Sequence, residues 1–97
     1  MSTTSSSLRI EGELTIYRAA ELAAAMKASL AQVPAGAAFE IDLSGVTEMD
    51  SAGVQLLLAA RRSASESGRT LRVAGDSPAV AEVFRTLQLA PLFGAAH

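Results

Sequence analysis

The feature that most constrains the fold is an alternation of short strand-like runs with longer helix-like runs. Apolar, strand-like runs are followed by helix-like ones within residues 8–30, 38–67 and 70–87. Strands joined through helices favour a mostly parallel sheet with helices packed against it. We therefore predict an α/β domain of element order β-β-α-β-α-β-α. Its sheet is expected to be mostly parallel, with four strands packed against three or four helices.

The first predicted elements precede Pro34. The run LRIEGELTI alternates apolar and polar residues around Gly12, which predicts two short strands that meet in a tight hairpin or bend. From Tyr17 to Leu30 the chain is rich in alanine, with larger apolar side chains four residues apart, a pattern typical of a helix. Such a helix leaves room for a shallow apolar groove, although close packing is the simpler outcome.

The central elements come next. The run AFEIDL, residues 38–43, predicts a strand that enters a loop over residues 44–50. A helix is expected from about Ser51 to Ser67, and Gly68 is placed to end it in the left-handed conformation. The loop would therefore deliver its last residues to the start of a helix.

The last predicted elements are a short strand, TLRVAG, and an amphipathic helix. Ser77 is placed to cap this helix, and Pro78 occupies the first helical position, where proline is tolerated. Its apolar residues recur at helical spacing: Val80, Val83, Phe84 and Leu87. Leu92 and Phe93 are expected to fold back on the domain. Residues 1–7, rich in serine and threonine, are expected to be a flexible tail, and residues 8–97 a single domain.

Composition excludes several classes of function. The chain of 97 residues has no cysteine and one histidine, His97, so thiolate zinc sites and histidine-based catalysis have no residues to use. A formal net charge of -2 with no basic run argues against nucleic-acid binding. No apolar run is long enough to span a bilayer, and the start does not resemble a secretory signal. We therefore expect a cytoplasmic protein without metal or cofactor.

Catalysis by the central loop is also disfavoured. Ser51 beside Asp50 superficially resembles a nucleophile with an acid, but a serine nucleophile needs a base within hydrogen-bond reach. Lys27 lies on another predicted helix, and the single histidine is in the C-terminal tail. The pair Glu48 and Asp50 has no aromatic surface nearby that would suggest a sugar cleft. We expect the protein not to be an enzyme.

Two interpretations remain open for the sequence Asp50-Ser51-Ala52-Gly53. Either Asp50 or Ser51 caps the following helix, and Gly53 is small because a neighbouring segment approaches closely. Alternatively, Ser51 is phosphorylated at the helix N-terminus, where backbone N–H groups favour negative charge but the nearby carboxylates of Asp50 and Glu48 oppose it. The residues alone favour the cap over the switch.

The run IDLSGVTEMDSAGVQLLL resembles the signature of the STAS domain family, which includes sulfate-transporter domains and anti-sigma-factor antagonists. The resemblance extends from LRIEGELTI to FRTLQLAPLF and implies a STAS-like fold. It also implies a regulatory, non-enzymatic domain that binds a partner protein. In the antagonists, a serine kinase phosphorylates the residue just before the glycine. That position is Ala52 in this chain, so Ser51 is a substitute candidate for phosphorylation.

The resemblance leaves two kinds of partner open. One is an anti-sigma factor, serine kinase or chemotaxis kinase in a bacterial partner-switching pathway. The other is the ATPase of a phospholipid-transport ABC system, on which a STAS subunit docks. In both cases the predicted binding surface is the same loop and helix: Glu48, Met49, Asp50, Ser51, Ala52, Gly53 and Gln55.

Overall fold

The structure is a computed structural model that describes residues 6–93. Three parallel strands form one sheet in the order β1-β2-β3: β1 (Ser6–Leu14), β2 (Ala38–Met49) and β3 (Thr70–Asp76). The α-helices are α1 (Ala19–Leu30), α2 (Ser51–Glu66) and α3 (Pro78–Leu87). Two short 3₁₀ turns complete the described chain, η1 (Ile16–Arg18) and η2 (Ala90–Phe93). The predicted α/β class and parallel sheet are therefore confirmed.

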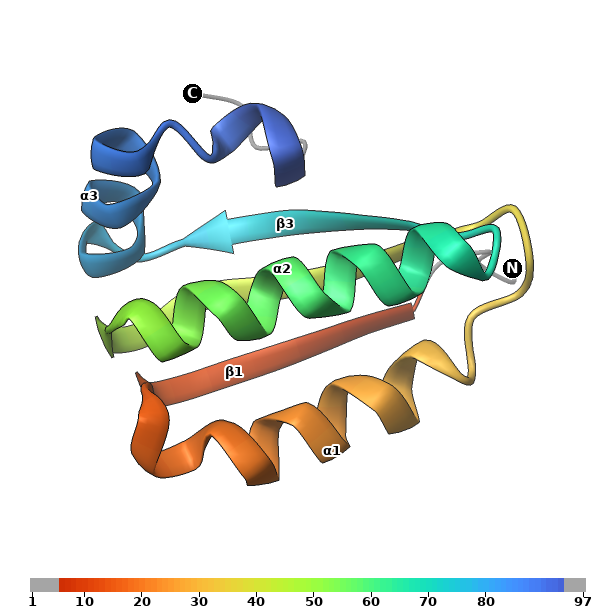
Figure 1. Cartoon of the computed structure of the whole chain (residues 1–97), viewed down its shortest axis with the longest axis horizontal. Helices are drawn as coiled ribbons and strands as arrows, with labels where there is room; N and C mark the ends of the chain where they lie inside the picture. Colours follow the sequence, from red (N-terminus) through yellow and green to blue (C-terminus); the bar gives the residue numbers. More distant parts are fainter. Residues whose placement is uncertain (1–5, 94–97) are drawn as a thin grey trace.

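Helices α1 and α2 cover the same face of the sheet. Each crosses from one parallel strand to its neighbour, and right-handed crossovers in a constant direction place successive helices on one side. Figure 1 shows α1 beside β1 and α2 lying across the middle of the sheet. The side chains directed toward these helices alternate along β2, where Phe39, Ile41 and Leu43 are fully buried. The opposite face carries charged side chains, including the ion pair between Arg9 and Asp42 at 3.0 Å.

The predicted pair of strands around Gly12 is one strand in the structure, so the sheet of residues 6–93 has three strands rather than four. Both halves of β1 pair in parallel with β2, Leu8 opposite Ile41 and Leu14 opposite Met49, so the chain does not reverse. Gly12 adopts a positive φ of 83° between two shifts of register, which is the geometry of a β-bulge.

The side chain of Arg18 holds the irregular part of β1. Its guanidinium donates hydrogen bonds to the carbonyl oxygens of Glu11 and Glu13, the latter at 2.9 Å. These residues flank Gly12, so the arginine binds carbonyl groups at the point where the strand register shifts. The hairpin or bend predicted at Gly12 is instead a bulge within one strand, because pairing with β2 continues on both sides of it.

The predicted loop over residues 44–50 was also wrong in extent. Strand β2 continues through Met49, because the second half of β1 supplies hydrogen-bonding partners from Gly45 to Met49. Strand β3 pairs only with residues 38–43 of β2, and α3 contacts β2 as well. The connection between β2 and α2 is reduced to Asp50.

Several terminal predictions can be compared with the structure. Ser77 caps α3 by accepting a hydrogen bond from the Val80 N–H at 3.2 Å, and Pro78 is the first helical residue, as predicted. Phe93 folds back and is fully buried, whereas Leu87 is 53% exposed and does not join the core. Strand β1 begins at Ser6, inside the predicted tail. Residues 1–5 and 94–97 lie outside the described range.

Candidate functional site

The candidate site lies at the edge of the sheet where β1 and β2 end side by side. Leu14 is opposite Met49 in the register, after which the chain enters η1 on one side and α2 on the other. In parallel α/β sheets, this carboxyl edge is where functional turns gather. The junction brings residues 14–18 against residues 48–55, although they are far apart in the sequence.

Asp50 joins the two halves of this edge. One carboxylate oxygen accepts a hydrogen bond from the Gly53 N–H at 3.0 Å and so caps α2. The other accepts from the Ile16 N–H at 3.1 Å, in the turn that follows β1. Asp50, rather than Ser51, is therefore the helix cap. The hydrogen bond from Ile16, followed by the one from Gly53, lowers the pKa of the Asp50 carboxyl below its usual 3.8.

Acid should lower the free energy of unfolding, and part of this loss should come from Asp50. A carboxyl whose folded pKa lies below 3.8 stabilises the fold above that pH, and the stabilisation is lost as the pH falls through the folded value. Asp50→Asn should therefore flatten the dependence of the unfolding free energy on pH below about pH 4. Urea denaturation at a series of pH values measures this dependence. Ser51→Ala changes no titrating group and should keep the wild-type slope; an equally steep slope in Asp50→Asn would refute the assignment.

Gly53 lies where α2 comes closest to β1. Its position is buried, and a methyl group built there would lie 2.2 Å from the carbonyl oxygen of Leu14. The same carbonyl accepts a hydrogen bond from the Asp50 N–H at 3.4 Å. The glycine therefore allows a close approach of helix and strand, as the sequence suggested, and this approach keeps the edge compact.

Ser51 is the first residue of α2 and is exposed. Among residues 6–93, Asp50 caps the helix, and the hydroxyl of Ser51 takes no part in the cap. Ala52, where the resemblance would place a phosphorylated residue, is half-buried.

The other predicted binding residues divide by exposure. Glu48 and Gln55 are exposed on the same edge. Met49 is half-buried and packs against the hydrophobic core, and Gly53 is buried, so both support the edge instead of presenting a side chain. Three of the predicted residues, Glu48, Ser51 and Gln55, are therefore available for contact.

Sequence reasoning missed two exposed apolar residues. Ile16 is 61% exposed and Tyr17 is 88% exposed, on the 3₁₀ turn that Asp50 holds through the Ile16 N–H. The sequence pattern placed Tyr17 at the start of a helix, where an apolar side chain is expected to pack. The only available signal was the cluster of β-branched and aromatic residues Thr15-Ile16-Tyr17 directly before the alanine-rich run.

Two further findings limit the chemistry of the described residues. Within residues 6–93, no group of three His, Cys, Asp or Glu side chains is placed to hold a metal ion. Among the helices of the same range, none combines the length and the apolar character needed to cross a membrane.

The fold and this edge define a small parallel α/β domain with a preformed strand–turn–helix junction. A family model described as "Mlab, STAS domain" matches residues 1–93. The chain belongs to the STAS domain family. Comparison with curated proteins gave no match.

Solved structures of the family resemble the chain along most of its length. The anti-sigma factor antagonist SpoIIAA in its unphosphorylated form is 27% identical, with a TM-score of 0.69 over 100% of this chain and 84% of that chain. An anti-sigma factor antagonist from Mycobacterium paratuberculosis is 27% identical, with a TM-score of 0.79 over 98% of this chain and 79% of that chain. The SulP transporter STAS domain from Vibrio cholerae is 20% identical and shares the fold. Its TM-score is 0.70 over 97% of this chain and 71% of that chain.

Proposed function

We propose that this chain is a non-enzymatic, cytoplasmic regulator that works by binding a protein partner in a bacterial partner-switching pathway. We define its partner surface as Ile16, Tyr17, Glu48, Ser51 and Gln55. The observation that carries the proposal is the strongly exposed pair Ile16 and Tyr17, fixed beside the Asp50–Ser51 junction. The likeness to anti-sigma factor antagonists supports the same class of role.

The partner surface has the composition of a protein interface. Tyrosine is enriched among the residues that dominate binding energy, because it buries a large rigid ring and retains a hydrogen-bonding hydroxyl. Tyr17 here stands on backbone that is tied to Asp50, so little order is lost when it is covered. Around it, the polar side chains of Ser51 and Gln55 would form the rim.

Phosphorylation of Ser51 would change the charge of the partner surface and so its affinity for a partner. Transfer of the terminal phosphoryl group of ATP to the serine oxygen, with release of ADP and a proton, would add a charge of about -1.5 to -2. That charge would lie at the start of α2, next to the carboxylates of Asp50 and Glu48. SpoIIAA is known in both unphosphorylated and phosphorylated forms, which supports regulation of this kind.

Binding to a purified serine kinase, anti-sigma factor or chemotaxis kinase encoded near this chain tests the proposal. Tyr17→Ala should weaken the complex roughly 30-fold, as expected for a binding hot spot. Ser51→Asp should weaken it at least tenfold, and incubation with the kinase and ATP should give one added phosphate by intact mass. Leu87→Ala, an equally simple truncation of an exposed leucine on α3, should bind like the wild type. Unchanged binding of both Tyr17→Ala and Ser51→Asp would refute the surface.

An alternative is supported by the family model that matches the chain, described as "Mlab, STAS domain". In that case the same surface docks constitutively on the ATPase of a phospholipid-transport ABC system. Tyr17→Ala should then release the ATPase, whereas no phosphorylated species should form with a kinase and ATP. Co-purification with a single identified ABC ATPase would favour this alternative over partner switching.

A further inference from the structure

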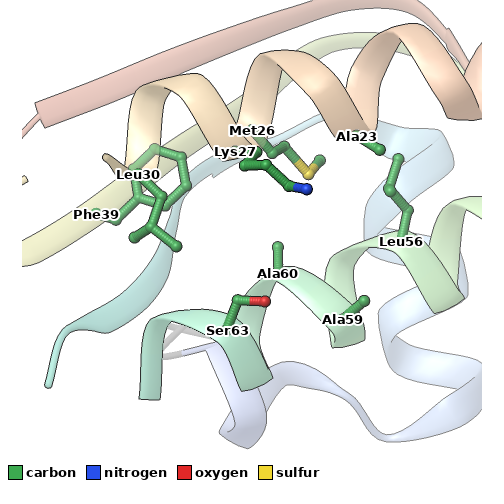
Figure 2. Close-up of a pocket in the computed structure, with 9 residues that line it drawn as sticks. All are labelled: Ala23, Met26, Lys27, Leu30, Phe39, Leu56, Ala59, Ala60 and Ser63. Carbon is green, nitrogen blue, oxygen red and sulfur yellow. The ribbon is translucent and has the colours of Figure 1, made fainter. Parts of the chain in front are cut away.

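Helices α1 and α2 do not close completely against each other. Between them lies a cavity of about 160 Å³. Its lining comes from both helices and the sheet: Ala23, Met26, Lys27, Leu30, Phe39, Leu56, Ala59, Ala60 and Ser63. Figure 2 shows the α1 side chains facing those of α2 across this gap.

The cavity follows from the sequence of the two facing helix surfaces. The α1 residues recur at positions i, i+3, i+4 and i+7 from Ala23, and the α2 residues recur in the same way from Leu56. Such surfaces normally interdigitate, but Ala23, Ala59 and Ala60 carry only a methyl group and leave the space between them unfilled. The gap therefore belongs to the packing of two ordered helices.

The interior of the cavity is apolar and extends to the core. Phe39 of β2 and Met26 lie at its base, but Phe39 is fully buried and Met26 nearly so. The accessible wall comes from Leu30, Leu56 and the alanines of the two helices. Leu30 and Leu56 lie near its two ends (Figure 2). A cavity of about 150 Å³ lined by such side chains takes up benzene, so this one suits an aliphatic segment of about six carbons.

The lining contributes two polar side chains, Lys27 and Ser63. Lys27 on α1 is exposed, and its ammonium has no carboxylate within ion-pair distance among the described residues. Its side chain runs along the wall of the cavity, and the hydroxyl of Ser63 stands on the opposite helix (Figure 2). A short apolar slot with one ammonium at its border is complementary to an aliphatic monocarboxylate.

We propose that the cavity between α1 and α2 binds a medium-chain fatty acid. The hydrocarbon chain would lie against Leu30, Leu56 and the alanines between them, and the carboxylate would pair with the ammonium of Lys27. This site shares no residue with the partner surface, so its occupancy and protein binding can be measured separately.

Titration of the ¹⁵N-labelled protein with octanoate, followed by ¹H–¹⁵N correlation spectra, tests the proposal. Saturable shifts should be confined to residues of the two facing helix surfaces. From butanoate to octanoate the dissociation constant should fall about fourfold for each added methylene, and it should level off once the cavity is filled. Octanol, which has the same chain without the charge, should bind more weakly than octanoate.

Two kinds of variant separate the charged part of the site from the apolar part. Lys27→Met keeps a long side chain without the charge and should bind octanoate at least fivefold more weakly, with octanol unaffected. Ala60→Met should fill the cavity and abolish binding of both ligands, and Ala59→Met provides a second plug should the first fail to fold. No saturable shift with any chain length would overturn the proposal, as would undiminished octanoate binding in Lys27→Met or in a folded plug variant.

Discussion

Replacing Gly53 by alanine should lower the free energy of unfolding by about 3 kcal/mol, the upper part of the usual range for overpacking. The added methyl group would meet the Leu14 carbonyl oxygen at 2.2 Å, a distance that no relaxed contact allows. Neither partner can yield easily. The carbonyl belongs to a paired strand and accepts the Asp50 N–H, and the glycine lies in the first turn of a capped helix.

Thermal and urea denaturation of Gly53→Ala would measure this loss. The matched control is Gly68→Ala. Gly68 has a positive φ of 77° but no atom within 4 Å of the added methyl group, so its replacement should cost only about 1 kcal/mol of backbone strain. Gly53 is helical and has no positive φ, so a loss in Gly53→Ala no larger than that in Gly68→Ala would show that the contact with Leu14 relaxes at little cost.

Replacing Phe93 by alanine should cost about 3–5 kcal/mol, the range found for truncating a buried aromatic side chain. Phe93 is fully buried in η2 and stacks on Phe84 of α3, with ring centroids 5.3 Å apart. The Leu92 carbonyl beside it accepts a hydrogen bond of 2.7 Å from Arg61 of α2. The turn therefore closes the core between α3 and α2, and the loss of the ring would leave a cavity there.

Leu92→Ala is the control for this prediction. The neighbouring leucine is in the same turn but is 39% exposed, so its truncation should cost less than about 1 kcal/mol while preserving the Leu92 carbonyl. Urea denaturation of both variants gives the comparison. A stability of Phe93→Ala close to that of Leu92→Ala would show that η2 contributes little to the folded core.

Predictions that depended on local sequence agreed best with the structure. The start of α3 was read from Ser77 and Pro78 because capping and the fixed φ of proline act within a few residues. The end of α2 near Gly68 was read for the same reason, and that glycine has the expected positive φ. The start of α2 at Ser51 agrees with the structure because an acid, a small residue and an apolar helix follow one another in the chain.

Predictions that depended on distant partners were less accurate. The hairpin or bend predicted at Gly12 is a bulge within one strand, since a positive φ suits turns and bulges equally and only pairing with β2 decides between them. The extension of β2 to Met49 depends on the same pairing. The exposure of Tyr17 depends on Asp50 holding the preceding residue, a contact across 34 positions that no local pattern reveals.

The strictly parallel order of the three strands has a consequence for how the chain reaches this fold. No two neighbouring strands are joined by a hairpin, so each pairing closes a loop of more than twenty residues before its hydrogen bonds form. During synthesis, β1 has no strand to pair with until β2 has left the ribosome. The edge that carries Tyr17 and Ser51 therefore cannot form before both β1 and β2 have left the ribosome.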